Sequence, residues 1–150
     1  MGKPNLFVFS LCLCILACAS GEKDNHGTIE ILKRKILESD RIEISIIPSR
    51  HSQMSFKAME IEEPDEISRI STYVDERQPV YPKIFSSLPD GYLSLYKDDV
   101  HTLDLYFVLD SIQGTFQVLG DGMELKITEP GTAFLTKIYA DKRWEPTDIK

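Results

Sequence analysis

The sequence has few cysteines, and none of them lies beyond residue 18. Cys12, Cys14 and Cys18 are its three cysteines. The rest of the chain therefore has no disulfide, no thiolate metal site and no cysteine nucleophile. We expect it to fold on a hydrophobic core alone, which a chain of 150 residues is long enough to bury.

The sequence also lacks the compact motifs of nucleotide and hydrolase chemistry. It has no glycine-rich phosphate loop and no G-x-S-x-G, H-E-x-x-H or EF-hand spacing, so no cofactor is expected. Basic residues are outnumbered, with 17 Lys and Arg against 24 Asp and Glu and a formal net charge of −7. Because nucleic-acid-binding domains gather Lys and Arg on one face, no nucleic-acid partner is expected.

The longest hydrophobic run is too short to cross a membrane. Leu6–Leu16 is an uncharged, mostly apolar run that follows Lys3, and it has about half of the roughly 20 residues that a spanning helix needs. A short apolar run between a basic residue and several small residues is typical of a secretory signal. Residues 1–17 are therefore predicted to be a signal peptide, and the protein is expected to be exported.

The end of this segment, Ile15-Leu16-Ala17-Cys18, resembles the lipobox of bacterial lipoproteins. The resemblance implies a lipid on Cys18 and cleavage ahead of it, and therefore a membrane partner at the cell membrane or outer membrane. It covers only residues 1–18, and the domain behind it is not recognised. Ala17-Cys18-Ala19 is also an A-x-A cleavage site, which would release a freely secreted protein.

Composition divides the rest of the chain into three parts. Residues 18–27 are polar and contain glycine, which is typical of a flexible tether. Residues 28–143 are expected to form a single domain, and residues 144–150 a charged tail. Trp144 is expected to hold the last helix against the sheet.

Hydrophobic periodicity predicts an α+β fold. Helices are expected at 28–39, from 63 to before Pro79, and at 130–141; strands at 41–46, 54–62, 92–96, 102–109, 115–119 and 123–128. Thr28 is a candidate N-cap, a strand over IEILK is the alternative for the first helix, and residues 78–90 are expected to be a loop. Short turns between consecutive strands predict a mostly antiparallel sheet of five to six strands with two to three helices packed on one face.

Three tyrosines form a candidate binding patch. Tyr92 and Tyr96 share one side of a predicted strand, and Tyr106 lies on the solvent side of the next. If these strands are neighbours, the three rings form a partly exposed surface of the kind that partners contact. The alternatives are that tyrosines merely suit half-buried strand positions, or that the first helix covers them. We refer to these three residues as the tyrosine patch.

The segment from Asp98 to Asp104 contains a candidate metal site. Asp98, Asp99 and His101 offer oxygen and nitrogen ligands to a divalent cation, but they straddle a predicted turn, where aspartates also serve turn geometry.

We therefore expect a non-enzymatic binding or structural role in the cell envelope, with an envelope protein or wall component as partner. One alternative is a freely secreted binding or inhibitor module cleaved after Ala19. A further alternative is a small metal-assisted hydrolase that uses His101 with Asp98 and Asp99. The sequence leaves the oligomeric state open.

Overall fold

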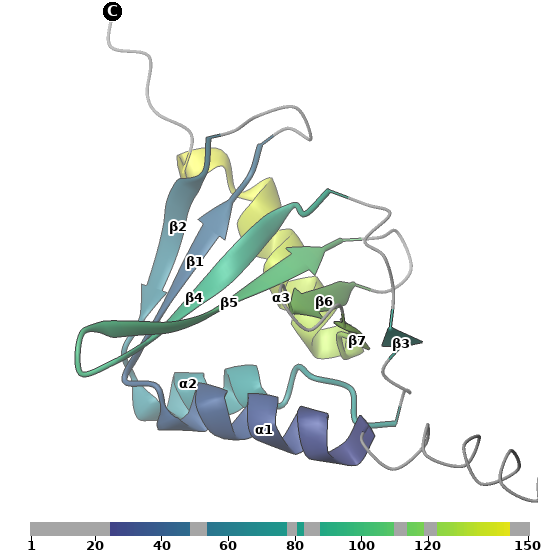
Figure 1. Cartoon of the computed structure of the whole chain (residues 1–150). Coiled ribbons are helices and arrows are strands. Elements are labelled where there is room, and N and C mark those ends of the chain that lie inside the picture. The colour runs from purple at the N-terminus through teal and green to yellow at the C-terminus, as the bar shows by residue number, and fades with distance from the viewer. Residues whose placement is uncertain are drawn as a thin grey trace, which may run out of the picture.

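The structure is a computed structural model of the chain, and it describes residues 25–48, 54–77, 81–82, 88–109, 114–118 and 123–144. These residues form three α-helices, one short 3-10 helix and seven strands (Figure 1). The helices are α1 (Asn25–Glu38), α2 (Pro64–Ser71), α3 (Glu129–Ala140) and the 3-10 helix η1 (Lys142–Trp144). The strands are β1 (Arg41–Ile46), β2 (Phe56–Ile61), β3 (Tyr81–Pro82), β4 (Gly91–Lys97), β5 (Val100–Val108), β6 (Thr115–Val118) and β7 (Met123–Lys126).

The seven strands form one antiparallel sheet in the order β2-β1-β4-β5-β6-β7-β3. Together with the three helices, this sheet confirms the predicted α+β class. The two-residue strand β3 is the addition, because it pairs with β7 inside the segment expected to be a loop. A strand of two residues is too short to show a hydrophobic period. It can be recognised only from its pairing with β7, which lies far along the chain.

One face of the sheet is apolar and covered by the helices. The register aligns Ile44 with Leu93, and Leu93 with Leu105, so that alternate residues of neighbouring strands form continuous rows. The three helices pack on this side, α1 and α2 next to each other below the strands and α3 behind them (Figure 1). We call this side the helix-covered face and the opposite side the open face.

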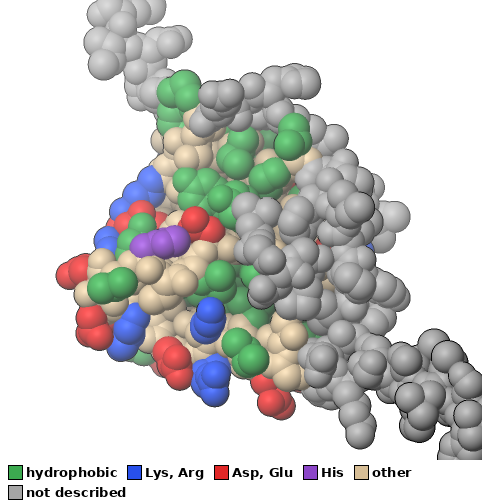
Figure 2. Space-filling model, in the orientation of Figure 1, with side chains coloured by type: hydrophobic (Ala, Val, Ile, Leu, Met, Phe, Trp, Pro, Cys, Tyr) green, Lys and Arg blue, Asp and Glu red, His purple; other side chains and the backbone are tan. Residues whose placement is uncertain are grey.

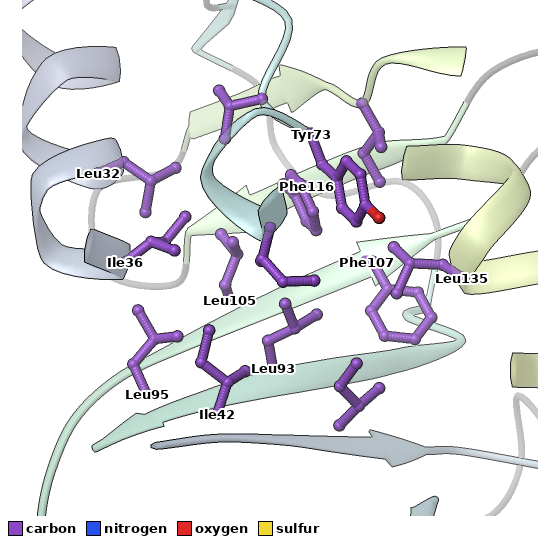
Figure 3. Packing of buried hydrophobic residues seen from close by; sticks show 14 of the residues in the cluster. Leu32, Ile36, Ile42, Tyr73, Leu93, Leu95, Leu105, Phe107, Phe116 and Leu135 are labelled. Carbon is purple, nitrogen blue, oxygen red and sulfur yellow. The ribbon is translucent and has the colours of Figure 1, made fainter. Parts of the chain in front are cut away.

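The helices meet the sheet through short stripes of buried side chains. Figure 3 shows Leu32 and Ile36 of α1 and Leu135 of α3 directed toward the strand residues. The fully buried side chains of the sheet include Ile42, Ile44, Ile46, Leu93, Leu95, Leu105, Phe107, Phe116 and Leu125. Each such side chain contributes about 1.5–3 kcal/mol through its removal from water, so this cluster holds the helices on one face.

Gly91 makes room for the buried ring of Phe107. It lies opposite Phe107 in the register, and a Cβ at Gly91 would come within 2.4 Å of the Phe107 ring and of the Ser45 carbonyl oxygen. Because glycine has no side chain, the Phe107 ring occupies that space and is fully buried.

The first helix begins earlier than its sequence pattern indicated. α1 starts at Asn25, so Thr28 lies inside the helix and the N-cap prediction is wrong, as is a strand over IEILK. Residues 25–27, expected in the tether, belong to this helix. Asn, His and Gly have low helix propensity, so these three residues do not by themselves indicate that the helix extends to them. Residues 49–53 and 120–122, which lie in short turns expected between neighbouring strands, are outside the described residues.

Candidate functional site

Two neighbouring strands carry the tyrosine patch on the open face. β4 and β5 form a hairpin whose register places Tyr92 directly opposite Tyr106 and Tyr96 opposite His101. Since side chains alternate along a strand, Tyr92, Ser94 and Tyr96 all point away from the helices. The three tyrosines are partly exposed, and no helix of the described part of the chain covers them, so they form the surface that their spacing predicted.

Tyr92 and Tyr106 are in ring contact. Their centroids lie 5.4 Å apart with the rings tilted by 43°, a favourable geometry for an aromatic pair. The Tyr92 hydroxyl shares a 2.7 Å hydrogen bond with Ser55 Oγ. Burial, followed by the charge of Asp104, raises the pKa of the Tyr106 hydroxyl, so Tyr106 stays a neutral donor and acceptor at physiological pH.

Tyr96 has less of its ring available. The Arg41 guanidinium lies over the ring at 4.2 Å from its centroid, and the His101 imidazole approaches it edge-on at 5.6 Å. A cation over an aromatic face is attracted by the ring's quadrupole. The surface at this end of the tyrosine patch is therefore formed by Arg41 and His101 as well as Tyr96.

A carboxylate lies between the two halves of the tyrosine patch. Asp104 Oδ1 accepts a 2.6 Å hydrogen bond from Ser94 Oγ and lies 2.8 Å from His101 Nε2. A nucleophilic triad needs the imidazole between the hydroxyl and the carboxylate, whereas here the carboxylate is in the middle. The network can orient His101 and Ser94, but His101 does not reach the Ser94 hydroxyl as a base.

A β-bulge brings His101 and Asp104 together. Leu95 pairs with Leu103 and Tyr96 with His101, so Thr102 is an extra residue in β5. In a regular strand, residues three apart point to opposite faces, but the extra residue places both His101 and Asp104 on the open face.

The candidate metal ligands do not converge. Asp98 and Asp99 are the two turn residues of the β4–β5 hairpin, with φ of 51° and 60°. The Asp98 backbone N–H donates to Asp40 Oδ2 at 2.6 Å, and the Asp99 carboxylate lies 3.5 Å from the Arg41 guanidinium. Among the residues that the structure describes, no group of three or more His, Cys, Asp and Glu side chains is placed to hold a metal ion.

A hollow beside β2 was not predicted from the sequence. This hollow, of about 320 Å³, is lined by Lys57, Ala58, Met59, Ile138, Asp141, Arg143 and Trp144. Trp144 stacks on Phe56 at 6.2 Å and contacts Tyr139 at 6.3 Å, so it holds the end of α3 against β2 as expected. Two segments far apart in the chain, β2 and the end of α3 with η1, build the hollow, which is why no local pattern predicts it.

Comparison of the chain with protein-family models, curated proteins and solved structures found no match. In the described ranges, none of the helices has the length and apolar character that crossing a membrane requires. Cys18, the candidate lipidation site, lies outside the described residues. Inference about function therefore rests on the chain's own residues.

Proposed function

We propose that the protein is an exported, lipid-anchored domain of the bacterial envelope with a non-enzymatic binding role. In this proposal Cys18 carries the lipid, and the open face of the sheet contacts an envelope protein or wall component. The observation that carries the binding role is the contact pair Tyr92–Tyr106, partly exposed on that face.

The chemistry of the open face suits recognition. Partly exposed tyrosines offer apolar area and a polar tip at low conformational cost, which is why they are enriched where proteins bind partners. Figure 2 shows the molecule from this side, with hydrophobic side chains interspersed among charges of both signs. Arg41 and Asp104 flank the rings and are held by their own neighbours, so the polar groups are fixed before a partner arrives.

The arrangement of Asp104 favours binding over hydrolysis. Both hydrogen bonds of this carboxylate end on Oδ1, which leaves Oδ2 able to accept from a partner. In this role the Ser94–Asp104–His101 network positions an acceptor and activates no nucleophile.

The lipid anchor is tested by the intact mass of the mature N-terminus purified from native membranes. A diacylglyceryl group on Cys18 supports the proposal. A soluble chain beginning at Ser20 would instead establish the freely secreted form.

The binding role is tested by sedimentation with isolated cell-wall material and envelope membranes. We expect the double variant Tyr92→Ser/Tyr106→Ser to reduce the retained fraction about tenfold, in the range of a binding hot spot. Ile31→Ser is the matched control, because Ile31 is an apolar residue that is 49% exposed and lies in α1, on the helix layer rather than on the open face. Equal retention of wild type and double variant would overturn the role of the patch.

A further inference from the structure

We infer that β2 is a dimerisation edge, on which a second copy of this chain pairs antiparallel about a two-fold axis through Met59. In this register, Lys57 lies opposite Glu60 of the second copy, and Glu60 lies opposite its Lys57. The inference concerns the sheet edge and does not depend on the lipid or on the tyrosine patch.

The first observation is that β2 ends the sheet. It pairs with β1 on one side, and no strand of the described part of the chain pairs with its other side (Figure 1). Such an edge presents backbone N–H and C=O groups in the spacing that another strand matches. An antiparallel strand of the same sequence satisfies these groups and continues the sheet.

The second observation is a bulge that makes the charges of β2 self-complementary. Lys57 pairs with Ser45 and Glu60 with Glu43, with the register shifted between them, so Ala58 is an extra residue. Lys57 and Glu60 therefore both lie on the open face, where they form an ion pair within the chain.

The extra residue also centres the symmetry on Met59. Lys57 and Glu60 lie one pairing position on either side of Met59, once Ala58 is left out of the register. Directly opposed residues on an antiparallel two-fold axis must share a face, and this arrangement satisfies that rule. Without the bulge, Lys57 and Glu60 would point to opposite faces and could not pair between copies.

The third observation is an exposed methionine beside a hollow. Met59 is 37% exposed, although it lies opposite the buried Ile44 on the helix-covered side of the sheet. It lines the hollow with Ile138 and Trp144. In the dimer the two Met59 side chains meet on the axis and are covered by the two hollows, and flexible methionines suit such irregular spaces.

Electrostatics favours a second copy over a charged partner. Lys57 Nζ lies 3.4 Å from Glu43 and is paired with Glu60, while Arg143 is paired with Asp141. The Glu60 hydrogen bond raises the pKa of Lys57, so both partners stay charged through the physiological range. The strand itself thus carries one cation and one anion, which an antiparallel copy of it complements.

Cysteine crosslinking in the full chain tests the register. In the dimer, directly opposed residues have Cα atoms about 4.5–5.5 Å apart, within the range of a disulfide. We expect Met59→Cys to give a disulfide-linked dimer under a mild oxidant. Lys57→Cys alone and Glu60→Cys alone should give none, whereas these two variants expressed together should link to each other. Val100→Cys, exposed in the β4–β5 hairpin, is the matched control, and the unaltered chain reports any link through Cys12, Cys14 or Cys18.

Charge reversal tests whether the crosslink depends on the pairing of Lys57 with Glu60 between copies. In the Met59→Cys background, Lys57→Glu or Glu60→Lys alone places like charges opposite each other, and the crosslinked fraction should fall about tenfold. Mixing the two reversed chains restores opposite charges between copies but not within either chain. Recovery of the crosslink in the mixture therefore supports the intermolecular pair.

Three outcomes would overturn the inference. A monomer that never links at Met59→Cys would mean that the bulge and Lys57 serve to protect the edge. Linking at every position tested would indicate random collision. A link from Met59→Cys to a different protein would identify a partner strand instead of a second copy. Circular dichroism melting curves of each variant show whether a variant that no longer crosslinks is still folded.

Discussion

The two faces of the sheet carry different kinds of side chain on the same strands. Along β4, Leu93 and Leu95 face the helices and are fully buried, while Tyr92, Ser94 and Tyr96 alternate with them on the open face. On the helix-covered face, the apolar side chains pack against one another and against the helices, and they form no hydrogen bonds. The open-face residues form specific polar contacts with named partners instead.

The two faces differ in how much their side chains contribute to the stability of the fold. Excluding water from the helix-covered face supplies the main stabilisation, so those positions need apolar volume and little else. A neutral hydrogen bond of the open face, such as the one between Tyr92 and Ser55, contributes only about 1 kcal/mol in net terms. Side chains that are fixed but weakly stabilising are the ones that a binding role can use.

The largest expected loss of stability comes from the helix-covered face. Phe107→Ala removes a fully buried ring that fills the space above Gly91, and should lower the free energy of unfolding by about 3–5 kcal/mol. Urea unfolding followed by circular dichroism measures it. A loss below about 1 kcal/mol would mean that the ring is not part of a packed core.

A smaller effect is expected where the helix layer joins the sheet. Asp75 follows α2, its backbone N–H donates to the Lys126 carbonyl at 2.9 Å, and its side chain is 4% exposed. Hydrogen bonds from Arg77 to the carboxylate lower the pKa of Asp75. Replacing this carboxylate by Asp75→Asn should cost about 1–3 kcal/mol at pH 7.

The sign of the pH dependence follows from that lowered pKa. The stabilisation by Asp75 is fully present above the ordinary aspartate pKa of about 3.9 and is lost as the pH falls through the lower value of the folded state. The free energy of unfolding, measured from pH 7 to pH 2, should therefore change less with pH for Asp75→Asn than for the unaltered chain. Glu66→Gln is the control, because the ion pair of Glu66 with Arg69 is exposed and weak, and it should leave the profile nearly unchanged.

On the open face, loss of a ring should affect binding more than folding. Tyr106→Ser lies next to Phe107 in the chain, yet it should cost no more than about 1–1.5 kcal/mol, because the ring is only partly buried. Thermal melting of Tyr106→Ser and Phe107→Ala in parallel measures the contrast. Similar losses for both would show that the tyrosine belongs to the core, and would remove the basis for a binding patch.

The strand pattern was predictable because it depends on a period of two. Alternation alone placed Tyr92 and Tyr106 on the solvent side, and the short turn between their strands made them neighbours. The helix stripes at Leu32 and Ile36 and at Ile67 and Ile70 follow from their own period in the same way.

The bulges were not predictable, and they decide the open-face pairs. An extra residue at Ala58 and another at Thr102 each shift the period by one, so residues three apart come to one face. The sequence therefore suggested Asp98 and Asp99 as partners for His101, whereas the bulge selects Asp104. A bulge depends on the register with the neighbouring strand, which a single strand's pattern does not contain.

The smallest expected effect, a gain, concerns the turn that joins the two strands of the tyrosine patch. Asp98 and Asp99 both have positive φ, a backbone conformation that Asn-Gly adopts with less strain. The double substitution Asp98→Asn/Asp99→Gly should therefore raise the free energy of unfolding by about 0.5–1 kcal/mol, since the Arg41 contact to Asp99 that it removes is exposed and weak.

The same variant decides the role of these carboxylates. If zinc or manganese raises the melting temperature of the unaltered chain and not of this variant, the aspartates bind metal, and the hydrolase alternative displaces the turn interpretation. If neither chain responds and the variant is more stable, the two aspartates serve the geometry that keeps Tyr92 opposite Tyr106.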